Sequence, residues 1–342
     1  MSETILSLRN VTKIFGRDLR EAKKLLSGGA EKDLIFRMTS ATIGAHDISL
    51  DIAEGEIFVI IGLSGSGKST LVRCLNMLHR PTAGKIFFKG KDVVAFSRKE
   101  LIDFRRNRIA MVFQNFGLLS HRNVLDNVAF GLEIRGIEKK KRYLSAFAAI
   151  DLVGLSGQEY SGIHTLSGGM KQRVGLARAL ASDPDILLMD EPFSALDPIV
   201  RRNMQAELLK IQKKVRKTII FITHDINEAF KLGDKIAIMR DGDLIQAGTP
   251  ETILYDPADD YVRDFVRDID KGKALCAWHV LEALPAGSNP VTPDITIRID
   301  TPLQDVIPLL KEGNLEQRIG ILDADGVLVG VTSGVKVLTA LS

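Results

Sequence analysis

Cysteine is scarce in this chain, since only Cys74 and Cys276 occur among its 342 residues. Two cysteines so far apart offer neither a disulfide framework nor the spacing of a zinc site, which fits a reducing compartment such as the cytosol. Long apolar runs are also missing: stretches such as 57–63 fall far short of the roughly 18 residues of a membrane-spanning helix. The first residues lack the basic-then-apolar pattern of an export signal. If the protein works at a membrane, we expect other chains to cross it.

An excess of one charge sign is absent as well. The chain has 46 basic and 43 acidic side chains, a formal net charge of +3. This balance argues against a dedicated nucleic-acid-binding protein, and we expect no nucleic-acid partner. The hydrophobic fraction of 45% excludes wholesale disorder. The length predicts a large domain with a smaller one, or two of medium size.

Apolar runs of strand length alternate with helical segments along most of the chain. Residues 57–61 form a continuous β-branched and aromatic run of the kind that parallel sheets bury on both faces. Similar runs occur at 109–113, 186–189 and 218–222. The pattern predicts an α/β fold with a mostly parallel sheet. Further strands are expected at 5–11 and 45–52, and helices at 17–24, 68–78 and 260–266.

The alternation of strand-like and helical segments ends after Gly248, where short helical segments follow. We place a domain boundary near residue 271. The first domain then covers 1–270 and the second 271–342. In the second, Thr301 and Pro302 are typical of a helix start, so a helix is expected over 301–311.

Residues 62–69, Gly-Leu-Ser-Gly-Ser-Gly-Lys-Ser, match the pattern G-x-x-x-x-G-K-[ST] between a buried strand and a helix. Glycines let backbone N–H groups close around phosphate oxygens, and the helix N-terminus adds partial positive charge. In this pattern Lys68 reaches the β- and γ-phosphates and the Ser69 hydroxyl binds Mg²⁺. The loop therefore predicts a nucleotide site. Its expected nucleotide-binding residues are Gly62, Ser64, Gly65, Ser66, Gly67, Lys68, Ser69 and Thr70.

Two carboxylates, Asp190 and Glu191, follow the buried run at 186–189. Ligands of open α/β sheets bind at this carboxyl edge of the strands. There Asp190 is placed to hold magnesium and Glu191 to polarise an attacking water. An acidic turn without a catalytic role would look similar.

A serine-glycine-glycine segment, residues 167–169, precedes a run of good helix formers. A helix N-terminus without bulky side chains accepts an anion through its N–H groups and the serine hydroxyl. Because the phosphate loop already serves one nucleotide, this second helix end implies either a second phosphate ligand or a nucleotide shared with another copy.

These motifs, in this order, resemble the ATP-binding subunit of an ABC transporter over about residues 6–270. The resemblance implies a P-loop NTPase fold with a RecA-like core, an antiparallel β subdomain and a helical subdomain. It also implies a head-to-tail homodimer that holds two ATP molecules, each between the phosphate loop of one copy and Ser167, Gly168, Gly169 and Asp197 of the other.

The resemblance carries over further roles. Gln114 matches a glutamine that contacts magnesium and moves with the transmembrane partner, and His224 matches a histidine at the γ-phosphate. The catalytic set is then Glu191, His224, Gln114 and Lys68, and the magnesium set is Ser69, Gln114 and Asp190. By itself, a histidine such as His224 is more often a strand-end residue without a catalytic role, but its place 33 positions after Glu191 favours the catalytic one.

The adenine of ATP is expected to stack on an aromatic ring upstream of the phosphate loop. Phe15 matches the family position, but an insertion at about 17–45 separates it from the loop. Phe36 within the insertion is a rival, and either ring could instead belong to the core.

The insertion, residues 57–67 and residues 260–266 resemble the branch of ABC importers that takes up quaternary amines such as glycine betaine, proline betaine or choline. The branch implies transmembrane permease subunits, an extracytoplasmic solute-binding protein, and a peripheral location at the cytoplasmic face of the plasma membrane. We expect 114–135 to line the groove that receives the permease. The contact candidates there are Asn115, Phe116, Leu118, Leu119 and His121.

The tail, through 318–332, resembles the closing half of a CBS (cystathionine-β-synthase-type) motif, with strands at 318–322 and 327–331 joined by a hairpin turn. Only one such motif fits in 271–342. With six basic and eight acidic residues, this tail has no cationic face for anionic lipid. The motif either pairs with its copy across a dimer and regulates activity, or merely stabilises the chain.

Three alternatives stay open: an importer ATPase for another small solute, a non-transport ABC-type ATPase acting on ribosomes or DNA, and a nucleotide sensor without turnover. The single set of motifs disfavours the second, and the presence of both Glu191 and His224 disfavours the third.

Overall fold

A computed structural model describes residues 3–114, 116–267, 269, 271–283, 292–310, 315–323 and 326–341. The chain forms two compact units, Met1–Asp225 with Leu232–Thr249, and Ile226–Lys231 with Pro250–Ser342. Each unit is described by itself.

A six-stranded sheet in the order β10-β9-β3-β8-β7-β6 forms the centre of the first unit. Its strands are β3 (Ile57–Ile61), β6 (Ile109–Phe113), β7 (Ile186–Asp190), β8 (Thr218–Thr223), β9 (Lys235–Arg240) and β10 (Asp243–Gly248). β3 pairs in parallel with β8 and β9, and only β10 is antiparallel to its neighbour. Every residue of β3 and β8 is buried, which explains their unbroken apolar runs. The expected α/β fold is confirmed.

A second, antiparallel sheet has the order β2-β1-β4-β5. Its strands are β1 (Thr4–Phe15), β2 (Thr42–Ala53), β4 (Ala83–Phe88) and β5 (Lys91–Asp92). α3 (Lys68–Leu75) links the two sheets, since its Leu71 and Val72 share one hydrophobic cluster with Ile5 and Ile60. This shared core fixes the phosphate loop, which immediately precedes α3.

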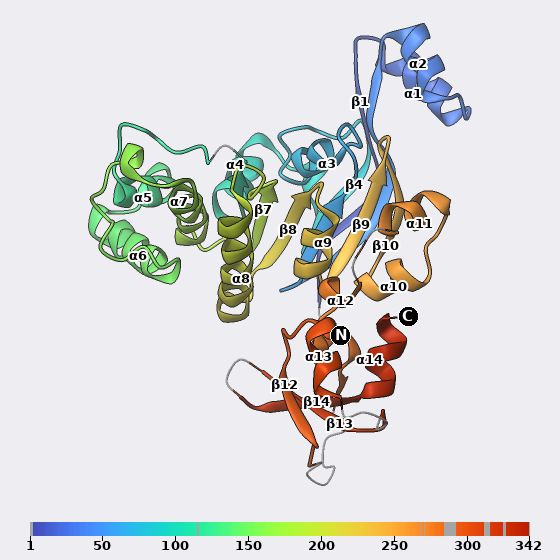
Figure 1. Cartoon of the computed structure of the whole chain (residues 1–342). Coiled ribbons are helices and arrows are strands. Elements are labelled where there is room, and N and C mark those ends of the chain that lie inside the picture. Colours follow the sequence, from blue (N-terminus) through green and yellow to red (C-terminus); the bar gives the residue numbers. More distant parts are fainter. Residues whose placement is uncertain are drawn as a thin grey trace. The chain divides into compact units, whose positions relative to one another are not determined.

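The remaining elements of the first unit are mainly helices: α1 (Leu19–Ser27), α2 (Lys32–Thr39), α4 (Arg98–Asn107), α5 (Val124–Ile134), α6 (Lys139–Leu152), α7 (Gly168–Ala181), α8 (Pro198–Val215), and the short turns η1 (Val93–Ala95) and η2 (Ile163–Thr165). Figure 1 shows α5, α6 and α7 packed together as a helical group, and α7 also contacts β6. None of the described helices has both the length and the apolar composition of a membrane span.

The insertion after β1 folds as a helical hairpin, α1 and α2, at the end of β1 (Figure 1). Asp18 caps α1, so this helix begins later than the expected 17–24 and extends further. The second helix is absent from the sequence expectation. Its Ile35 completes a small core with Ile14 and Ala22, which explains why both helices form.

The second unit contains α9 (Ile226–Leu232) in large part, α10 (Pro250–Tyr255), α11 (Asp260–Val266), α12 (Lys271–Ala274), η3 (Ala277–Val280), β11 (Glu282–Ala283), β12 (Ile295–Arg298), α13 (Leu303–Val306), η4 (Ile307–Leu309), β13 (Arg318–Leu322), β14 (Leu328–Ser333) and α14 (Gly334–Leu341). The sheet order is β11-β14-β13-β12, with β12 and β13 parallel. β13 and β14 pair antiparallel, as the hairpin expectation requires, although turn residues 324 and 325 lie outside the described residues.

The helix expected over 301–311 is much shorter than that. Pro302 is the N-cap, and the helix covers only Leu303–Val306 before a 3₁₀ turn. Pro308 lacks a backbone N–H and its ring blocks helix continuation, which accounts for the early end. Lys311 lies outside the described residues.

The compact units separate after Thr249, whereas we expected a boundary near 271. α10 groups with the tail because the Tyr255 hydroxyl donates to the carbonyl of Ala340. His279 and Glu251 also face each other, with 3.9 Å between Nε2 and Oε1. The division into domains at 270 stays a prediction from sequence.

Candidate functional site

The phosphate loop runs from β3 into α3, and its glycines occupy positions that other residues would obstruct. A Cβ on Gly62 would lie 2.2 Å from the carbonyl oxygen of Met239. Gly67 is the N-cap of α3 with φ +96°, and a Cβ there would lie 2.3 Å from the carbonyl oxygen of Gly44. The backbone therefore approaches its neighbours as closely as the motif predicts.

Lys68 is almost fully buried and lies over its own loop. Its ammonium donates to the carbonyl oxygens of Gly62 at 2.7 Å and Leu63 at 2.9 Å. Burial lowers the pKa of Lys68, while the charges of Glu191 and Asp190 act in the opposite direction. The cation is thus held at the loop, where a phosphate oxygen would replace carbonyls as its partner.

Ser69 and Asp190 meet between α3 and the end of β7. The Ser69 hydroxyl donates to Oδ1 of Asp190 at 3.3 Å. Burial raises the pKa of the Asp190 carboxyl, and the Ser69 hydrogen bond and the charges of Arg73 and Lys68 oppose it. A hydroxyl and a carboxylate side by side form a set of hard oxygen donors.

Glu191 and His224 face each other across adjacent parallel strands. Glu191 follows β7 with φ +46°, and its N–H donates to the carbonyl of Ile222 in β8 at 3.1 Å. Nδ1 of His224 lies 3.1 Å from Oε2 of Glu191. The register that aligns Asp190 with Ile222 brings these side chains together, a pairing that the sequence alone does not reveal.

Gln114 is exposed and directly follows β6, whose last residue, Phe113, pairs with Asp190. Two hydrogen bonds from Arg178 of α7 hold the next loop, at 2.6 Å to the carbonyl of Gly117 and 3.0 Å to that of Phe116. Sequence reasoning missed Arg178, because nothing in the sequence pairs it with loop residues 61 and 62 positions earlier. This arginine ties the helix of the serine-glycine-glycine segment to the glutamine loop.

Phe15 lies beside the phosphate-loop helix in spite of the insertion. A Cβ on Gly44 would lie 2.7 Å from the Phe15 ring and 2.9 Å from Thr70, so all three are neighbours. His79, which sequence reasoning also missed, packs edge-on against Phe15 with 5.1 Å between ring centroids. Phe36 is 56% exposed on α2. These positions favour Phe15 over Phe36 as the adenine partner, and its role stays a prediction.

The serine-glycine-glycine segment and Asp197 begin two helices. The Ser167 hydroxyl caps α7 by accepting from the N–H of Met170 at 3.3 Å, and Asp197 caps α8 through the N–H groups of Ile199 and Val200. Gly169 packs closely enough that a Cβ would lie 2.7 Å from Val200. Among the described residues, no hydrogen bond or ion pair joins Ser167 or Asp197 to the phosphate loop of the same chain.

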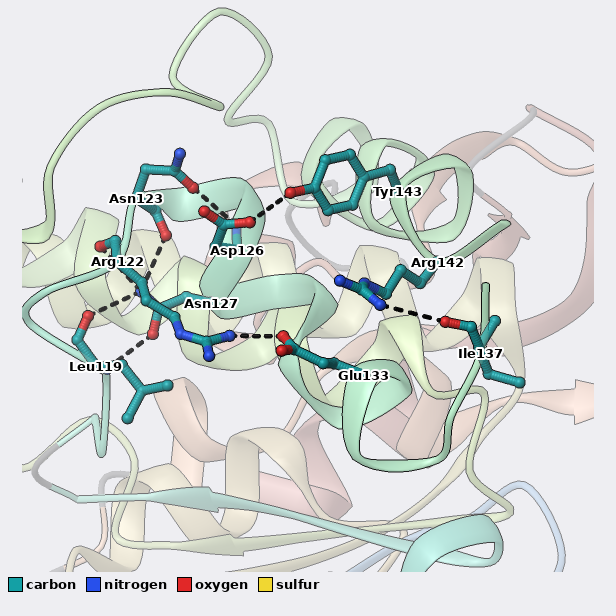
Figure 2. A network of polar contacts seen from close by, with 9 residues as sticks. All are labelled: Leu119, Arg122, Asn123, Asp126, Asn127, Glu133, Ile137, Arg142 and Tyr143. Atoms are coloured by element: carbon teal, nitrogen blue, oxygen red, sulfur yellow. Dashed lines mark hydrogen bonds and ion pairs between the residues drawn. The ribbon is translucent and has the colours of Figure 1, made fainter. Parts of the chain in front are cut away.

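A buried asparagine organises the loop before α5, as Figure 2 shows. Asn127 accepts from the N–H of Leu119 and donates to the carbonyls of Leu119, Arg122 and Asn123, at 2.8 to 3.2 Å. Arg122 also pairs with Glu133 at 2.6 Å. The loop thus has a defined shape.

The expected permease contacts lie on or near this loop. His121 is exposed, while Phe116, Leu118 and Leu119 are half-buried, and Asn115 lies outside the described residues. Their role in docking stays a prediction.

Comparison with known proteins identifies the family to which the chain is similar. Residues 45–194 match the family model described as "ABC transporter". The glycine betaine transport ATP-binding protein OpuAA of Bacillus subtilis (strain 168) is 46% identical over 326 residues, 95% of this chain and 75% of the relative. The trimethylamine N-oxide transport system ATP-binding protein TmoW of Ruegeria pomeroyi is 48% identical over 334 residues, 96% of this chain and 97% of the relative.

Among solved structures, the chain is similar to a dimeric ATP-binding cassette in a post-hydrolysis state bound to ADP and Pi. That structure is 30% identical with a TM-score of 0.59, and the match covers 71% of this chain and 98% of the cassette. The fold, the phosphate loop and the relatives that match 95% and 96% of the chain agree. The chain belongs to the ABC transporter family as one of its ATP-binding, ATP-hydrolysing subunits.

Proposed function

We propose that this chain energises an importer of quaternary amines or similarly methylated osmolytes, such as glycine betaine, choline or proline betaine. One observation carries the proposal: the relatives named for glycine betaine and trimethylamine N-oxide transport match 95% and 96% of the chain, far more than its nucleotide-binding motifs alone. Both of these solutes carry a trimethylated nitrogen.

In the proposed mechanism, the phosphate loop and Lys68 hold the ATP phosphates while Glu191 accepts a proton from the attacking water. His224, 3.1 Å from the Glu191 carboxylate, positions that base and meets the γ-phosphate. Phosphoryl transfer depends on positioning and charge neutralisation, which these groups supply from several directions. The Phe15 ring supports the adenine.

Ser69, Asp190 and Gln114 would hold Mg²⁺. The fit rests on Ser69 and Asp190, whose oxygen atoms lie 3.3 Å apart. Among the described residues, no three His, Cys, Asp or Glu side chains are grouped so that they could hold a metal ion. Mg²⁺ usually binds through one or two protein oxygens together with substrate phosphates. When bound, the ion neutralises charge on the transferring phosphate.

Ser167, Gly168, Gly169 and Asp197 would act on the nucleotide of a second copy. The support is the dimeric state of the similar cassette and the absence of contacts from Ser167 to its own phosphate loop in the described residues. A helix N-terminus free of bulky side chains would then face the γ-phosphate from the opposite side.

The remaining partners are a transmembrane permease and an extracytoplasmic solute-binding protein, with this subunit peripheral at the cytoplasmic face of the plasma membrane. The hydrogen-bonded loop around Asn127, within the segment 114–135, is the proposed permease contact. A loop held by several hydrogen bonds suits a surface that transmits motion of the Gln114 segment.

The tail at 271–342 is proposed to act as a single CBS-like regulatory unit that pairs with its copy. The β12-β13-β14 arrangement followed by α14 supports it. Deletion of the tail should leave ATP hydrolysis intact but change assembly or the ionic-strength response of transport. Unchanged assembly and response would leave it a stabilising appendage.

An uptake assay tests the main proposal. The chain is reconstituted in liposomes with its permease and binding protein, and ATP-driven accumulation of radiolabelled glycine betaine, choline and trimethylamine N-oxide is compared with that of an amino acid. Accumulation of at least one methylated amine, lost with Glu191→Gln, is expected. Transport of the amino acid alone would assign the chain to another importer.

A further inference from the structure

The second unit contains a cavity of about 410 Å³ that plays no part in the function proposed above. α10 contributes Glu251 and Tyr255, the η3 turn contributes His279, and α14 contributes Lys336. Its apolar wall includes Leu275 and Leu281. The size is that of a small-molecule site.

His279 offers a hydrogen bond that the protein does not use. Its side chain is only 1% exposed, and Nδ1 accepts from the N–H of Cys276 at 2.8 Å. Nδ1 also lies 3.2 Å from the Cys276 carbonyl oxygen, but the shorter contact with the N–H makes Nδ1 the acceptor and places the ring proton on Nε2. Burial lowers the His279 pKa, which favours the neutral ring. Nε2 has no hydrogen-bond partner among the described residues. A buried N–H without an acceptor is costly, so an oxygen atom from a ligand would stabilise it.

The charged side chains that line the cavity determine which charge a ligand can carry. Glu282 forms an ion pair with Lys336, and with His279 neutral this leaves the Glu251 carboxylate as the uncompensated charge of the lining. Oε1 of Glu251 lies 3.9 Å from Nε2 of His279, too far for a hydrogen bond but close enough for one ligand oxygen to reach both. A carboxylate or phosphate at Nε2 would be repelled by Glu251, whereas a hydroxyl could accept from His279 and donate to Glu251.

The aromatic and apolar surfaces suit a methylated cation. The Tyr255 hydroxyl donates to the carbonyl of Ala340, which fixes the ring. The ammonium of Lys271, which does not line the cavity, lies 5.3 Å from the Tyr255 ring centroid, so a ligand cation in the cavity would share this ring with Lys271. Leu275 and Leu281 complete a surface for methyl groups.

We propose that this cavity is a binding site for a small organic cation that carries a hydroxyl group. The positive charge faces Glu251 and Tyr255, and the hydroxyl oxygen accepts from Nε2 of His279. The site involves none of the nucleotide-binding residues, so it stands or falls independently of the transport proposal. A ligand there touches α10 and α14 together and therefore stabilises the second unit.

Trp278 provides a direct readout, because it is the only tryptophan of the chain and stacks on His279 with 3.6 Å between ring centroids. The full chain is titrated with choline while Trp278 fluorescence and calorimetric heat are recorded. Two comparison ligands separate the contributions: the neutral analogue with a tert-butyl group in place of trimethylammonium, and tetramethylammonium, which lacks the hydroxyl. Saturable choline binding is expected, with each comparison ligand roughly tenfold weaker or more.

Matched variants complete the test. Glu251→Gln keeps the side-chain shape without the charge, and His279→Asn keeps an acceptor for Cys276 while removing the Nε2 donor. Both should weaken choline binding roughly tenfold or more. Asp260→Asn, at a side chain that is 90% exposed, should leave it unchanged. Absence of saturable choline binding by both methods, equal binding of the neutral analogue, or full affinity in Glu251→Gln would overturn the proposal.

Discussion

Glu191 occupies a backbone position that few glutamates adopt, with φ +46° immediately after a buried strand. Such strained positions persist where surrounding contacts fix them, and they concentrate at functional sites. Here the N–H bond to Ile222 fixes the backbone and His224 lies against the carboxylate. The geometry directs the side chain to the same edge of the sheet as Lys68 and Asp190.

Replacing Glu191 with glutamine should retain ATP binding and lower turnover by roughly 10²-fold or more, because an amide cannot accept the proton of the attacking water. Steady-state hydrolysis and fluorescent-nucleotide binding measure the two effects. Glu54→Gln, at a side chain that is 52% exposed, is the matched control. Undiminished hydrolysis in Glu191→Gln would remove the catalytic role.

Asp190 should reduce the stability of the nucleotide-free chain at neutral pH. Burial raises the pKa of Asp190 in the folded chain, so the folded chain favours the protonated carboxyl. The stabilisation from this protonated form is complete below the ordinary pKa of 3.8 and is lost as pH rises through the raised pKa. Asp190→Asn cannot ionise, so its free energy of unfolding should exceed that of the native chain by an amount that grows with pH. Urea unfolding across the acid to neutral range measures it. A pH-independent difference would contradict this account.

Gly67 and Gly65 form a matched pair for testing the phosphate loop. Both have positive φ, +96° and +82°, but only at Gly67 would a Cβ meet backbone, 2.3 Å from the Gly44 oxygen. Gly67→Ala should therefore cost about 2 kcal/mol more free energy of unfolding than Gly65→Ala. Equal losses in urea unfolding would show that the loop relaxes around the new methyl group.

At the scale of elements, the loop before α5 depends on one buried side chain. Asn127 bonds the backbone of Leu119, Arg122 and Asn123 (Figure 2). A second contact links α5 to α6, since the Tyr143 hydroxyl donates to Asp126 at 2.6 Å. The proposed permease contact therefore rests on α5 rather than on a free loop.

Asn127→Ala should destabilise the chain by about 2 kcal/mol, because buried N–H and C=O groups lose their partner. The isolated chain should keep most of its ATP hydrolysis but lose its response to the permease. Exposed Asn203, in α8, supplies the control variant Asn203→Ala. An unaltered permease response in a destabilised Asn127→Ala chain would place the contact elsewhere.

Local signals allowed the central elements to be predicted. β3 and α11 have the expected bounds, because a buried apolar run and a capped helix are encoded locally. α2 was missed because its stability comes from packing Ile35 on Ile14, far apart in sequence. The helix predicted over 301–311 is wrong because Pro308 cannot continue an α-helix, and the helix ends at Val306.

At the nucleotide site too, local motifs can be predicted from the sequence, whereas contacts between distant residues cannot. The phosphate loop is a local motif, whereas the approach of Phe15 to Thr70 and of His224 to Glu191 depends on strand pairing. His79 and Arg178 gave no sequence signal at all, since each acts on a residue distant in the chain.

For the whole molecule, the account requires a shared site. The phosphate loop and the serine-glycine-glycine segment lie on different parts of the first unit, and within the described residues no polar contact joins them through Ser167. If each ATP lies between two copies, a variant defective in one half can be complemented by a variant defective in the other.

Mixing two inactive chains, Lys68→Ala and Ser167→Arg, tests this claim most directly. A mixed dimer contains one pocket with both halves native, so hydrolysis should reappear at up to about a quarter of the native rate, as random pairing of two copies requires. Each variant alone, assayed at the same total concentration, should stay inactive. A mixture as inactive as its components would show that the hydrolytic site lies within a single chain.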